Sequence, residues 1–154
     1  MPLITWGPQL ETGIAIIDSQ HKRLVDIINE MNDALVEGRS DEIMSAIFDE
    51  LVDYTETHFK VEEKLLASHD YEDFENHRRE HRVFTDQIKM DRDNFNAGVW
   101  QLDQRMMDYL RGWLMNHIQV SDQANFIANV STGLIQVDDA VDTDAIVARI
   151  SDKT

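Results

Sequence analysis

The segment that most constrains this chain is residues 58–81, which carries two pairs of candidate metal ligands. His58 is followed four residues later by Glu62, and His77 is followed four residues later by His81. On an α-helix this spacing places both side chains on one face, one turn apart. Imidazole and carboxylate ligands together suit iron, zinc or manganese. The chain has no cysteine, so the sequence predicts a metal site with only nitrogen and oxygen ligands.

The amino-acid composition and net charge exclude several classes of protein and partner. The chain has 154 residues, of which 42% are hydrophobic, and this is enough for the core of one domain. Its formal net charge of −16 argues against nucleic acid and against anionic membrane surfaces as partners. We see no secretory signal and no apolar run near the ~20 residues that span a bilayer. We therefore expect a cytoplasmic protein without membrane insertion.

Apolar residues recur at steps of three and four in four segments, which predicts four amphipathic helices. Pro2, Gly7, Pro8 and Gly13 disfavour a helix at the start of the chain, which we interpret as an arm packed on the body. Short connections between four helices favour an antiparallel up-down-up-down bundle. The predicted segments are an arm at 1–17, helices at about 19–37, 40–68, 74–95 and 102–120, and an acidic extension at 131–154 that forms a short helix or a tail.

Local signals set the predicted ends of these helices. Asp18 or Ser19 is the expected N-cap of the first helix, and Gly38 follows its last turn. The second helix should open at Ser40, with a buried stripe that begins at Ile43. We divide the chain into a bundle with its arm at 1–130 and the extension at 131–154.

The inward polar residues of the four helices are expected to lie at one level. In an antiparallel hairpin, residues equidistant from the turn lie side by side. Each pair of inward polar residues on consecutive helices is centred on the predicted connection between those helices. The residues brought to one level in this way are His21, His58, Glu62, His77, His81 and His117.

Asp122 is a seventh candidate ligand at the same level. It follows His117 by five residues, which rotates it by ~140° on an α-helix, so spacing alone does not select it. A lone inward histidine is usually a core residue, but a cluster of five without metal would be costly to bury. Five histidines and two carboxylates are too many for one ion and predict two. The sixth histidine, His69, falls in a predicted turn and is expected to be exposed.

The ligand pattern resembles the hemerythrin family, most closely its bacterial single-domain members. The shared sequence motif is His58-x-x-x-Glu62, His77-x-x-x-His81 and His117-x-x-x-x-Asp122, preceded by His21. The resemblance implies an all-α bundle with two Fe ions and no haem. It implies that His77, His81 and His117 hold one iron and that His21 and His58 hold the other. Glu62, Asp122 and an oxo or hydroxo group would then bridge the two ions.

By this resemblance, dioxygen would bind at an open position on the two-histidine iron. Leu114 lies one turn before His117 and is expected to roof that position together with Phe59, Trp113 and Ile118. We expect reversible dioxygen binding by a carrier, a store or a sensor input rather than by an enzyme. The alternatives left open are a di-iron enzyme that reduces nitric oxide or peroxide, and a redox-sensing or oxygen-sensing interaction module. A protein partner for the acidic extension is also left open.

Overall fold

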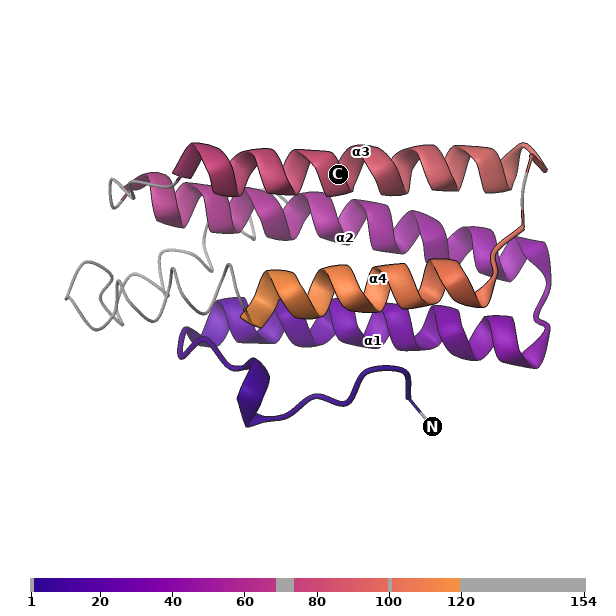
Figure 1. Cartoon of the computed structure of the whole chain (residues 1–154), viewed down its shortest axis with the longest axis horizontal. Coiled ribbons are helices and arrows are strands. Elements are labelled where there is room, and N and C mark those ends of the chain that lie inside the picture. The colour runs from indigo at the N-terminus through magenta and orange to yellow at the C-terminus, as the bar shows by residue number, and fades with distance from the viewer. Residues whose placement is uncertain (1, 69–73, 100, 120–154) are drawn as a thin grey trace.

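Four helices lie side by side in the part of the chain that the structure describes, and that part contains no strand (Figure 1). This computed structural model describes residues 2–68, 74–99 and 101–119. Helix α1 packs against α2 and α4, and α2 packs against α3. None of the described helices is long and apolar enough to cross a membrane. The all-α class and the four-helix bundle are therefore confirmed, with elements η1 (Pro8–Leu10), α1 (Ala15–Glu37), α2 (Asp41–Ser68), α3 (Phe74–Asn96) and α4 (Gln104–Asn116).

The start of α1 differs from the prediction. The helix begins at Ala15, so Asp18 lies inside its first turn and is not the N-cap. The Asp18 carboxylate accepts hydrogen bonds from the backbone N–H of Thr12 at 2.7 Å, from the Thr12 hydroxyl at 2.7 Å and from the backbone N–H of Gly13 at 3.2 Å. These bonds fix the backbone at Thr12 and Gly13, just before the helix. The first helical turn therefore begins at Ala15 and not after residue 18.

The N-terminal arm packs along the bundle, as the sequence indicates. Its Ile4 exchanges two hydrogen bonds of 2.8 Å with the Asn29 side chain of α1. Ile4 and Leu10 are both buried. Leu10 lies in the short 3-10 helix η1, which forms despite the neighbouring glycines because proline is accepted at a helix start.

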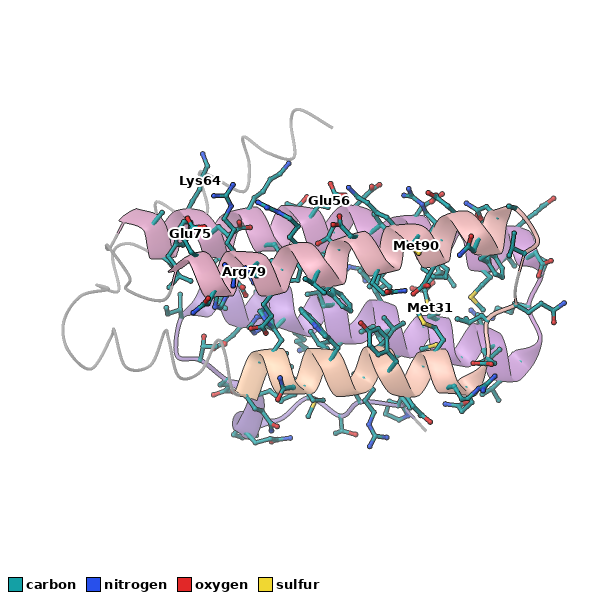
Figure 2. The ribbon with its side chains drawn as sticks, turned by 45° about the horizontal axis from the view of Figure 1, so that its top comes forward. Met31, Glu56, Lys64, Glu75, Arg79 and Met90 are labelled. Atoms are coloured by element: carbon teal, nitrogen blue, oxygen red, sulfur yellow. The ribbon has the colours of Figure 1, made fainter. Side chains whose placement is uncertain are left out.

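Two apolar clusters fill the bundle. The smaller cluster lies where α1 begins and α2 ends, and the larger one fills the rest of the interior. Figure 2 shows Met31 of the larger cluster between the helices, and this residue is completely buried. The prediction that Ile43 is buried was wrong, because Ile43 is 46% exposed and Met44 points inward instead. One residue step turns a helical side chain by ~100°, so a stripe read from sequence is easily misplaced by one position.

Thr55 provides a test of the bundle interior. It is 1% exposed, and its hydroxyl has no hydrogen-bond partner among the described residues. We expect Thr55→Val to raise the melting temperature of the metal-free protein by about 2–4 °C, because a desolvated hydroxyl without a partner costs about 1 kcal/mol. Thermal denaturation followed by circular dichroism measures this.

Thr85→Val is the matched control for this prediction. The Thr85 hydroxyl donates to the His81 carbonyl at 2.8 Å, so its removal should not stabilise the protein. A lower melting temperature for Thr55→Val would show that the Thr55 hydroxyl is hydrogen-bonded in solution.

Candidate metal centre

Six polar side chains converge in the interior of the bundle. Helix α1 supplies one of them, α2 and α3 supply two each, and the last directly follows α4. All six are between 0 and 2% exposed. The five histidines that the sequence predicts to lie at one height in the bundle are therefore brought together around the Glu62 carboxylate. The six residues are His21, His58, Glu62, His77, His81 and His117.

Glu62 lies at the centre, and its two oxygens face different histidines. Its Oε1 atom is 2.9 Å from His21 Nε2 and 2.5 Å from His58 Nε2. We call His21 and His58 the two-histidine group. The Oε2 atom faces the three-histidine group, with the Nε2 atoms of His77, His81 and His117 at 3.3, 2.9 and 3.3 Å. The carboxylate therefore lies between a set of two imidazoles and a set of three.

These distances fit a ligand set for metal ions. Ligand nitrogens and oxygens lie ~2.0–2.2 Å from a metal such as zinc, so neighbouring ligand atoms on one ion are roughly 3 Å apart. Four of the five nitrogen-to-oxygen distances around Glu62 are within a few tenths of an ångström of that separation, and the His58 distance of 2.5 Å is shorter. In each of two overlapping sets of four residues, the ligand atoms lie within 4.8 Å of one another, and both Glu62 and His117 belong to both sets.

Glu62 has the charge that a metal ligand needs. Burial alone would raise the pKa of its carboxyl group. The charges of His58 and His117, with hydrogen bonds from His117 and His21, outweigh burial and hold the pKa well below its ordinary value. The ionised form therefore persists in the core, where an isolated carboxylate would be very costly.

Two side chains outside the ligand layer orient the histidines. The Nδ1 atom of His58 is 2.7 Å from Gln20 Oε1, and Nδ1 of His117 is 3.1 Å from Glu80 Oε1. An N–H at Nδ1 that donates to these oxygens leaves Nε2 free to bind a metal.

The sequence analysis missed both of these partners, although each immediately precedes a histidine of the layer. One step along the helix turns such a residue toward the neighbouring helix. A third outer residue is Glu63, whose side chain is 23% exposed. Its Oε2 lies 3.5 Å from His81 Nδ1, and its Oε1 lies 3.6 Å from Arg78.

Two of the four residues predicted to line an oxygen pocket stack on histidines of this site, and the other two are buried and lie near His117 in the sequence. The Phe59 ring stacks on His81 with centroids 3.8 Å apart, and the Trp113 ring stacks on His117 at 4.7 Å. Leu114 and Ile118 are buried in the same apolar cluster as Phe59. The two stacked rings lie against the three-histidine group. The structure thus places Phe59 and Trp113 beside the three-histidine group, whereas the family resemblance implied a position beside the two-histidine iron.

Some predicted features fall outside the described residues. These include the proposed ligand Asp122, the turn residue His69 and the acidic extension with its domain boundary. Residues 117–119, just before Asp122 in the sequence, form a π-helical turn. A π turn closes hydrogen bonds between residues five apart, in place of the four of an α-helix.

Comparison with known proteins identifies similar chains. Residues 12–126 match the family model described as the hemerythrin HHE cation binding domain. A bacteriohemerythrin of Pseudomonas aeruginosa (strain LESB58) is 35% identical over 127 residues, which are 82% of this chain and 81% of that protein. One of Methylococcus capsulatus (strain ATCC 33009 / NCIMB 11132 / Bath) is 33% identical over 124 residues, 80% of this chain and 94% of that protein. The crystal structure of a wild-type hemerythrin has a TM-score of 0.76 at 30% identity, covering 80% of this chain and 95% of that chain.

Proposed function

Because this chain belongs to the hemerythrin family, we propose that it binds dioxygen reversibly at a non-haem di-iron centre. The observation that carries the proposal is the position of Glu62, whose two carboxylate oxygens face two separate histidine groups. A single carboxylate shared in this way is suited to bridge two ions. Imidazole suits iron, and a layer of five neutral imidazoles favours the ferrous over the ferric state of a bound iron.

We assign the ligands by the two groups. His77, His81 and His117 would hold one iron, His21 and His58 would hold the other, and Glu62 would bridge them. Asp122 and a solvent-derived oxo or hydroxo group would complete the bridge. The two-histidine group then offers one ligand fewer, which leaves a position for dioxygen. When bound, the two irons supply one electron each to dioxygen and recover them on its release.

The assignment of Asp122 is supported by the π-helical turn at 117–119. In a regular α-helix, a residue five positions after His117 points away from the face that His117 occupies. A π turn widens the helix, so residues five apart come closer to one face. Such turns are frequent at functional sites, and a π turn that begins at His117 supports a ligand role for the residue five positions later.

The chain's own apolar residues would protect the centre. Phe59 and Trp113 stack on two of the histidines, and Leu114 and Ile118 are buried in the apolar cluster to which Phe59 belongs. A dry environment excludes the water and protons that would allow reduced oxygen to leave as hydrogen peroxide, which would leave the iron oxidised. Reversible binding depends on this exclusion, whereas an enzyme that reduces nitric oxide or peroxide needs a supply of protons.

We expect metal analysis of protein expressed with ample iron to find two irons per chain. When the reduced protein is exposed to air, a new visible absorption band should appear and should disappear on removal of oxygen, through repeated cycles. A reproducible content of one iron would contradict the di-iron centre. Rapid irreversible oxidation would favour an enzyme or a redox-sensing module over a carrier.

A further inference from the structure

The two histidine groups differ in the side chains that contact their outer Nδ1 nitrogens. In the two-histidine group, His58 Nδ1 lies 2.7 Å from the neutral amide oxygen of Gln20. In the three-histidine group, His117 Nδ1 lies 3.1 Å from a carboxylate oxygen of Glu80. A second carboxylate, Glu63, lies 3.5 Å from His81 Nδ1 in the same group. Two described carboxylates, Glu80 and Glu63, therefore lie beside outer nitrogens of the three-histidine group, and Glu63 also lies 3.6 Å from Arg78.

A carboxylate and an amide act differently on a ligand imidazole. Both accept the Nδ1 proton and fix the ring so that Nε2 points at the metal. The carboxylate also adds negative charge, which makes the imidazole more basic and a stronger donor. Glu62 cannot create a difference between the groups, because it gives one oxygen to each.

We propose that Glu80 is a positioning residue that makes the three-histidine group the tighter of the two metal sites, so that the first ion enters there and the second enters the two-histidine group. This inference rests on the proposed di-iron centre. The Glu80 side chain is 35% exposed, so solvent screens its charge. Its effect on metal affinity should therefore be near the lower end of the 10–100-fold range for such partners.

The test replaces each outer partner by a nearly isosteric residue, in the variants Glu80→Gln and Gln20→Glu. Metal-free protein is titrated with Co²⁺, and calorimetry and the visible Co²⁺ absorption bands follow the two binding steps. In Glu80→Gln, the dissociation constant of the first step should rise about tenfold, with altered Co²⁺ bands, and that of the second step should stay the same. In Gln20→Glu, the second step should tighten about tenfold, with little change in the first. A general loosening of the bundle cannot produce these opposite changes.

Glu75→Gln is the matched control because it removes the same charge from the same helix. Glu75 lies on the outer surface of α3 (Figure 2), its side chain is 73% exposed, and it pairs with Arg78 at 3.7 Å. Both binding steps should match those of the parent. If Gln20→Glu fails to fold, the comparison of Glu80→Gln with Glu75→Gln remains decisive.

Two results would overturn the role of Glu80. One is that Glu80→Gln titrates like Glu75→Gln, and the other is that it weakens both steps equally. If the parent binds only one ion, the di-iron proposal fails. The affinity of that one ion in Glu80→Gln would still decide whether Glu80 strengthens a histidine ligand.

Discussion

Glu62→Gln should reduce the iron content from two ions per chain to one or fewer. Both Glu62 oxygens face ligand nitrogens, so the carboxylate is the shared donor of the two histidine groups. Glutamine has nearly the same shape, but it keeps only one oxygen acceptor and has no charge. Its NH₂ group would face imidazole nitrogens where a metal ion should lie. Metal analysis after reconstitution with excess ferrous iron, with circular dichroism to verify folding, measures this effect.

Glu63→Gln is the control for this experiment. Glu63 is the next residue of the same helix, but it contacts Arg78 and the outer Nδ1 nitrogen of His81 and not the inward-facing Nε2 atoms of the histidines. It should retain two irons with at most weakened affinity. A Glu62→Gln protein that still binds two irons would contradict the bridging role. In that case the metal ions would have to be held by other residues.

Leu114→Ala should shorten the lifetime of the oxygenated protein while leaving its iron content unchanged. Leu114 is 2% exposed and lies in the apolar cluster one turn before His117. Truncation leaves a cavity beside the centre that can admit water. Removing a buried leucine side chain typically costs ~2–5 kcal/mol, which lowers the melting temperature by roughly 5–15 °C in a chain of this size. Stopped-flow decay of the oxygen-dependent band, at a temperature where all proteins are folded, measures the lifetime.

Leu110→Ala separates this effect from a loss of stability. Leu110 lies one turn earlier on α4, belongs to the same apolar cluster and is completely buried. Its replacement should lower the melting temperature by a similar amount without shortening the lifetime. Equal decay rates in the two variants would mean that Leu114 only stabilises the core and that the oxygen position lies elsewhere.

The helices and the level of the ligand layer could be predicted from the sequence because both depend on local patterns. Apolar spacing located the four helices, and Gly38 marked the end of α1. Once the turns are placed, equal distance from a turn fixes height in an antiparallel bundle. The convergence of His21 and His58 therefore followed from residue numbers alone, within the accuracy of the predicted turns.

Only the tertiary structure decided what each ligand faces. The sequence could not show that Glu62 divides the histidines into groups of two and three, since this depends on how four helices are rotated about their axes. It also could not select Gln20 and Glu80 as outer partners, because each lies one residue from a ligand and its partner belongs to another helix. The sequence also did not show that Ile43 is exposed, because this depends on how its helix is rotated about its axis. Helical periodicity limits a side chain's direction only to about one residue step, and packing between helices determines the rest.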